Sequence, residues 1–127
     1  MIGYITLGTN NIEKAAQFYD QLLASLGATR FMESVRLIAW AVSPEQPAFC
    51  VVKPYDGESA SVGNGVMIAL SVDSPDKVDA LYQKALSLGA TCEGEPGPRQ
   101  LAGVYAAYFR DLDGDKLNVF NFAVTQS

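Results

Sequence analysis

The first part of the chain shows two kinds of hydrophobic periodicity in succession. Residues 4–8 (YITLG) alternate in polarity and include β-branched side chains, which predicts a strand. Residues 12–27 carry apolar side chains three and four positions apart, which predicts an amphipathic helix. Asn10 or Asn11 supplies a side-chain cap for this helix, and Gly27 is a natural stop. The opening pattern is therefore a strand followed by a helix.

Three further strands are expected after this helix, at 29–33, 35–42 and 48–53. A stretch rich in glycine and turn-forming residues follows, and we interpret 58–64 as a linker. The first module is thus a βαβββ unit over residues 1–57.

The second module, 65–127, repeats this plan. Its predicted elements are a strand at 67–72, a helix from Pro75 that stops at Gly89, a short strand at 91–93, and a hairpin of 104–110 and 116–122 turned by DLDGD. Tyr4 aligns with Met67, and LGAT occurs both at 26–29 and at 88–91. The chain is therefore predicted to be a tandem βαβββ repeat.

The motifs SLGAT, IALSVDSPDKVDAL and YFRDLDGDKLNVF give this repeat a recognisable identity. Together they resemble the vicinal oxygen chelate superfamily, the group of glyoxalase I, bleomycin resistance proteins and extradiol dioxygenases. The resemblance implies an α+β fold and one domain over 1–127. Its tandem modules form a curved mixed sheet around a ligand cleft, with the helices outside. It also implies a homodimer.

Composition narrows the function classes. Fourteen acidic residues oppose nine basic ones, for a net charge of −5, which disfavours nucleic acid and anionic membranes and favours a neutral or cationic small ligand. The chain has no histidine, so Ser–His, Cys–His and zinc–His mechanisms are excluded.

No signal peptide is visible, and no apolar stretch approaches the roughly 20 residues of a spanning helix. These features predict a cytoplasmic protein. Cys50 lies in the apolar run AFCVV and is expected to be a buried thiol.

The resemblance also bears on metal binding, because enzymes of this superfamily hold a divalent metal with histidine and carboxylate ligands. Those ligands come from the first and fourth strands of each module. In this chain the positions fall on Tyr4, Met67, Asn118 and, in the fourth strand of module one, near Val51. Mg²⁺, Mn²⁺, Ni²⁺ and Zn²⁺ need carboxylate or imidazole here. We therefore expect no metal and no cofactor.

Strand alternation extends the cleft to residues that share a face with these positions. Thr6, Ala69, Ser71 and Phe120 belong to this set, Trp40 and Tyr105 are strand aromatics that could line it, and Arg99 lies in a Gly/Pro loop as an anion anchor. The ligand-cleft candidates are therefore Tyr4, Thr6, Trp40, Val51, Met67, Ala69, Arg99, Tyr105, Asn118 and Phe120. Alternatively, Tyr4, Met67 and Trp40 are core residues of a contracted cleft. Small residues at Gly8, Ala69 and Ser71 favour an open cavity.

Three functions fit these features. The first is a metal-independent protein that binds or sequesters a small molecule such as a drug or metabolite. The second is an isomerase or lyase, similar to lactoylglutathione lyase but with an atypical or metal-free site. In that case Tyr4 would act with Glu33 or Asp56 as base, but no catalytic residue is assigned. The third is a structural or partner-binding role with a collapsed cleft. The identity of the ligand is not encoded in any motif.

Overall fold

The computed structural model describes residues 1–101 and 103–123, which contain two helices and eight strands. In chain order these elements are β1 (Tyr4–Gly8), α1 (Ile12–Ala24), β2 (Thr29–Glu33), β3 (Leu37–Ala41), β4 (Ala48–Val52), β5 (Ile68–Ser71), α2 (Pro75–Ser87), β6 (Thr91–Pro98), β7 (Val104–Arg110) and β8 (Lys116–Phe122). They form two compact units, and the boundary falls between Val62 and Gly63, inside the segment expected to be a linker. None of the described helices is long and apolar enough to cross a membrane.

Each unit contains one mixed four-stranded sheet with the same topology. The strand order is β1-β4-β3-β2 in the first sheet and β5-β8-β7-β6 in the second. The pairs β1–β4 and β5–β8 are parallel, and the remaining pairs are antiparallel. The predicted α+β class and the tandem βαβββ order are confirmed.

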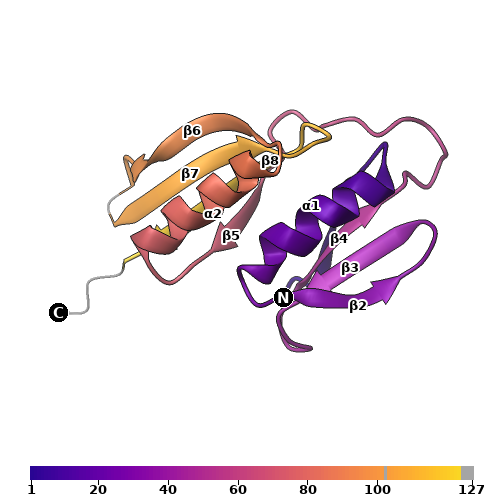
Figure 1. Cartoon of the computed structure of the whole chain (residues 1–127), viewed down its shortest axis with the longest axis horizontal. Helices are drawn as coiled ribbons and strands as arrows, with labels where there is room; N and C mark the ends of the chain where they lie inside the picture. The colour runs from indigo at the N-terminus through magenta and orange to yellow at the C-terminus, as the bar shows by residue number, and fades with distance from the viewer. Residues whose placement is uncertain (102, 124–127) are drawn as a thin grey trace. The chain divides into compact units, whose positions relative to one another are not determined.

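In the first unit, α1 lies along one face of the sheet (Figure 1). The Asn11 side chain caps the helix by accepting a hydrogen bond from the backbone N–H of Lys14 (3.1 Å). The buried side chains of the helix pack on every second residue of the strands, the ones that point toward the helix. The ring centres of Tyr19 and Phe49 are 4.7 Å apart. The apolar core of this unit therefore lies between α1 and one face of its sheet.

A polar clasp also joins α1 to this sheet. The carboxylate of Asp20 accepts hydrogen bonds from the Trp40 indole N–H (2.8 Å) and from Nε and Nη2 of Arg30 (2.8 and 2.6 Å). The bonds from Arg30 lower the pKa of Asp20 most, and the bond from Trp40 lowers it further, against the opposing effect of partial burial. The clasp satisfies the N–H of a tryptophan that is only 1% exposed.

The second unit is built in the same way. Ser74 caps α2 by accepting a hydrogen bond from the N–H of Lys77 (3.2 Å). The helix then packs on its sheet through residues such as Val78 and Leu81, which are almost fully buried. The Tyr105 hydroxyl donates to Asp79 on the helix (2.7 Å), so a polar contact again joins helix and sheet.

The strand predicted at 91–93 is longer in the structure, because β6 continues through a stretch that the sequence indicated to be a loop. Its pairing with β7 shifts register between Cys92 and Gly94 and again between Gly94 and Gly97. A Cβ at Gly94 would lie 3.0 Å from Cδ2 of Tyr108, so glycine allows the two strands to approach closely. The irregular pairing hid this strand from pattern analysis.

The clasp around Asp20 predicts a pH-dependent contribution to stability. We expect Asp20→Asn to lower the free energy of unfolding at pH 7 by about 1–2 kcal/mol, because charge-assisted bonds are lost next to a buried indole. Since the pKa of Asp20 is lowered on folding, its contribution is complete above the ordinary value of 3.8. It is lost as the pH falls through the lowered pKa of the folded state. Urea denaturation of both proteins from pH 7 to pH 2 measures the difference.

The matched control is Asp73→Asn, which removes an exposed carboxylate paired with Lys77 at 2.9 Å. This exposed pair contributes at most about 0.5 kcal/mol. Equal stability of Asp20→Asn and the wild type at pH 7 would contradict a stabilising role for the clasp.

Candidate functional site

The face of the first sheet turned away from α1, here called the far face, has a floor of small side chains. Cys50 pairs in register with Thr6 on one side and with Ala39 on the other, and Ala48 pairs with Tyr4. Because side chains alternate along each strand, these five point to the same face. Ala39, Ala48 and Cys50 are only 2%, 9% and 3% exposed.

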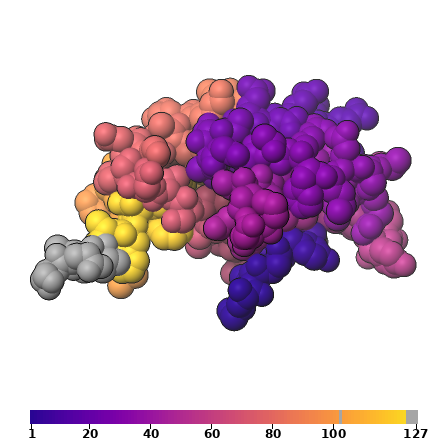
Figure 2. Space-filling view, turned by 90° about the horizontal axis from the view of Figure 1, so that it is seen from below, coloured from indigo at the N-terminus to yellow at the C-terminus, as the bar shows by residue number. Residues whose placement is uncertain are grey.

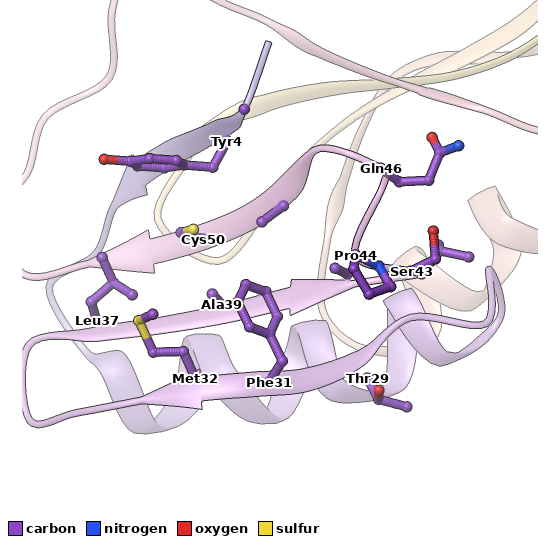
Figure 3. Close-up of a pocket in the computed structure, with 14 residues that line it drawn as sticks. Tyr4, Thr29, Phe31, Met32, Leu37, Ala39, Ser43, Pro44, Gln46 and Cys50 are labelled. Atoms are coloured by element: carbon purple, nitrogen blue, oxygen red, sulfur yellow. The ribbon is translucent and has the colours of Figure 1, made fainter.

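Larger side chains rise on both sides of this floor and enclose a hollow of about 690 Å³. Tyr4 on β1 forms one wall, and Phe31 and Met32 on β2 form the other (Figure 3). These three side chains are 66%, 58% and 54% exposed. In the space-filling view, the N-terminal residues, coloured indigo, project from the purple and magenta surface of the first unit (Figure 2). The whole hollow belongs to the first unit.

The lining of the hollow is uncharged. None of the fourteen described residues around it is acidic or basic. Its polar groups are a thiol, a phenol, and the hydroxyl and amide groups of Thr29, Ser43 and Gln46, which gather at one end (Figure 3). Burial raises the pKa of the Cys50 thiol and keeps it in the neutral, weakly nucleophilic form. The hollow therefore offers apolar contact and neutral hydrogen bonds.

Three cleft candidates lie on the helix-covered faces instead, which corrects the expectation for them. Trp40 donates to Asp20 of α1, and Tyr105 donates to Asp79 of α2. Val51 is 1% exposed and pairs in register with Leu7 and Ile38, which are also buried. The far-face position that was expected near Val51 is occupied by its neighbour Cys50, because neighbouring side chains of a strand point to opposite faces of the sheet.

The remaining strand candidates of the second unit lie on the far face of its sheet. Ala69 pairs with Asn118, and Phe120 occupies the next far-face position along β8. Asn118 is 5% exposed, and its amide donates to the carbonyl oxygen of Ala107 (3.2 Å). Met67 directly precedes β5 and is 41% exposed. Asn118 and Cys50 thus occupy corresponding positions in the two units.

The guanidinium of Arg99 is engaged in holding the end of β6. Its Nη2 donates to the carbonyl oxygen of Glu95 (2.6 Å), and its Nη1 donates to those of Gly97 (3.2 Å) and Pro98 (3.3 Å). The group also lies 5.3 Å from the ring centre of Tyr108. These contacts give Arg99 a structural role in the turn between β6 and β7.

The positions at which the resemblance implies metal ligands do not present a suitable donor set in this chain. They present the phenol of Tyr4, the thiol of Cys50, the thioether of Met67 and the amide of Asn118. Mg²⁺ and Mn²⁺ are held mainly by carboxylates, and Ni²⁺ and Zn²⁺ by imidazole, carboxylate or thiolate, whereas a thiol held neutral by burial is a poor ligand. Within residues 1–101 and 103–123, no three His, Cys, Asp or Glu side chains are grouped to hold a metal.

The two carboxylates considered as bases lie outside the hollow. Glu33 accepts a hydrogen bond from Arg30 (2.6 Å), and Asp56 accepts one from the backbone N–H of Glu58 (2.9 Å). Neither lines the cavity beside Tyr4. The arrangement can therefore bind a molecule, but it places no acid–base pair against one.

Sequence reasoning did not identify Phe31, Met32, Ser43 or Gln46 as lining residues. Two of them depend on a bulge in β2, and the other two lie in the turn between β3 and β4. The adjacent apolar residues Phe31 and Met32 in TRFME were the available signal of an irregular strand. In a regular strand two neighbouring side chains point to opposite faces, so one of them would be exposed when the other is buried.

Comparison with known proteins identifies similar folds and sequences. Residues 1–119 match the family model described as the Glyoxalase/Bleomycin resistance protein/Dioxygenase superfamily. A glyoxalase/bleomycin resistance protein from Albidiferax ferrireducens is 32% identical, covers 95% of this chain and 98% of its own, and superposes with a TM-score of 0.84. None of the curated proteins compared with the chain matches it significantly.

Two more distant structures show the likeness of fold alone. Lactoylglutathione lyase from Agrobacterium tumefaciens is 18% identical, with coverage of 95% and 92% of the two chains and a TM-score of 0.70. The fosfomycin resistance protein FosX from Listeria monocytogenes is also 18% identical, with coverage of 98% and 94% and a TM-score of 0.74.

The burial of Cys50 predicts a difference in thiol reactivity. At about neutral pH, a disulfide reagent should modify the exposed Cys92 first and should react with Cys50 at least roughly ten-fold more slowly. The Cys92→Ser variant should retain only the slow phase, and Cys50→Ala only the fast one. Two equal fast phases in the wild type would show that the floor of the hollow is not buried in solution.

Proposed function

The chain belongs to the glyoxalase/bleomycin resistance protein/dioxygenase superfamily, and we propose that it binds a small neutral molecule without a metal ion. The observation that carries this proposal is the uncharged hollow of about 690 Å³ on the far face of the first sheet. A volume of this size is typical of small-molecule sites, which are mostly apolar with a few hydrogen-bonding groups.

The exposure of the walls supports a binding role. Tyr4, Phe31 and Met32 leave more than half of their surface uncovered, although their side chains are large and apolar or aromatic. Covering such surface is favourable by roughly 25 cal/mol per Å². A ligand that fills the hollow would gain this contribution while resting on a floor that is already buried.

Sequestration is favoured over turnover by the chemistry of the lining. Acid–base catalysis needs a titratable group within hydrogen-bond reach of the substrate. The described lining offers only the Tyr4 phenol and the Cys50 thiol, and burial keeps that thiol neutral. The lyase and fosfomycin resistance activities of the two distant relatives are therefore not proposed for this chain. The homodimeric state and the cytoplasmic location stay predictions from the resemblance and the composition.

Binding in the hollow is testable with the neutral fluorescent probe N-phenyl-1-naphthylamine. We expect a saturable increase in its fluorescence with the wild-type protein. Ala48→Leu should weaken binding by about ten-fold, because the larger side chain projects from the floor into the hollow. The matched control, Ala80→Leu, changes an exposed residue of α2 and should bind the probe as the wild type does. Equal probe affinity in both variants would place the binding elsewhere.

Metal independence is tested by dialysis against zinc, nickel, cobalt and manganese, followed by elemental analysis per chain. The phenol, thiol, thioether and amide at the ligand positions predict far less than one metal ion per chain. They also predict the same probe affinity with and without a chelator. One tightly held metal ion per chain would overturn this part of the proposal.

A further inference from the structure

A bulge in β2 determines how the second wall of the hollow is made. Arg30 pairs with Trp40, and the next pair in register is Met32 with Ala39, so Phe31 is the extra residue. Arg30 faces α1, where it binds Asp20. Both Phe31 and Met32 line the hollow on the other face (Figure 3). A regular strand would turn one of these two side chains toward the helix.

The far face forms a trough whose floor consists of small side chains, and the bulge adds Phe31 to one of its walls. In the order β1-β4-β3-β2, the wall strands are three strand spacings apart, roughly 14 Å between backbones. The rings of Tyr4 and Phe31 narrow this width, and the floor between them consists of Ala39, Ala48 and Cys50. Aromatic rings pack well on such walls, in offset or edge-to-face contacts with Tyr4 and Phe31 and beside the Met32 sulfur.

The two ends of the trough differ in polarity. Leu37 and Met32 lie at one end, and Thr29, Ser43 and Gln46 lie at the other (Figure 3). The polar end offers hydroxyl and amide groups, which can both donate and accept hydrogen bonds. No charged side chain of the described lining is available to balance an ionised substituent.

Given the binding function proposed above, we infer that the ligand is a flat aromatic molecule that carries a neutral hydrogen-bonding group at one end. Its ring lies on the floor between Tyr4 and Phe31, and its polar group meets Thr29, Ser43 and Gln46. The rings of Tyr4 and Phe31 together favour an aromatic ring over a saturated one, and Phe31 is the ring that the bulge adds to this face.

Three probes built on the same fused bicyclic ring system test this inference by isothermal titration calorimetry at neutral pH. 2-Naphthol has the aromatic ring and a neutral hydroxyl, decahydro-2-naphthol has the hydroxyl without the aromatic ring, and 2-naphthoate carries a negative charge. We expect 2-naphthol to bind about 3- to 10-fold more tightly than its saturated analogue, from ring contacts beyond area burial. We expect 2-naphthoate to bind more weakly than 2-naphthol, because its charge finds no partner in the lining.

The variant Phe31→Leu keeps an apolar side chain of similar reach and removes one of the two rings, so its preference for 2-naphthol over decahydro-2-naphthol should be clearly smaller than that of the wild type. Phe122→Leu makes the same change at an exposed position of the second unit and should keep the preference. Thermal unfolding of both variants verifies that they are folded.

The outcomes separate the two proposals. Equal affinity for 2-naphthol and decahydro-2-naphthol would overturn the aromatic selectivity and leave the binding function intact. Tighter binding of 2-naphthoate would overturn the neutral substituent. An unchanged preference in Phe31→Leu would overturn the role of Phe31. Absence of binding by all three probes would overturn the inference, and failure of N-phenyl-1-naphthylamine to bind as well would overturn the proposed function.

Discussion

Within each unit of this protein, one helix packs on one face of the four-stranded sheet. Strand side chains alternate between faces, so half of them can be buried under α1 or α2 and the other half must point away. In the first unit the residues under the helix are large and apolar, as expected for a core, whereas those on the far face are mostly small. The hollow exists because small far-face residues lie between the large side chains of the two edge strands.

This constraint makes the site sensitive to a single step in register. Cys50 and Val51 are neighbours in one apolar strand, yet one forms the floor of the hollow and the other is part of the core under α1. Trp40 and Ala39 divide in the same way on β3, where the indole N–H is satisfied by Asp20. The bulge in β2 is the exception to strict alternation, because it adds Phe31 to the far face without moving Arg30 from its partner on the helix.

The repeat of strand and helix periodicities was sufficient to predict the tandem βαβββ order, because both helices show a clear period and are bounded by a cap and a glycine. Only β6 was predicted too short, because its pairing with β7 is irregular. The site was only partly predictable. Tyr4, a cleft candidate that the resemblance implied, lies on the hollow of the first unit. The lining from Phe31 depends on a bulge. The adjacent apolar residues Phe31 and Met32 were compatible with one, but alternation alone could not assign both of them to the far face. Arg99 could not be assigned from sequence either, because its role depends on carbonyl groups of a turn whose path was unknown.

The net charge of −5 acts on an approaching ligand over a longer distance than the uncharged lining of the hollow does. Several carboxylates of the first unit are already paired, as Asp20 and Glu33 are with Arg30, and none of the described ones lines the hollow. Charges outside the lining act through solvent that screens them within about 8–10 Å at ordinary ionic strength. They can attract a cation toward the protein, but they offer it no partner once it has left water for the hollow. The composition alone favoured a neutral or cationic ligand, and the uncharged lining is the reason why we propose a neutral one.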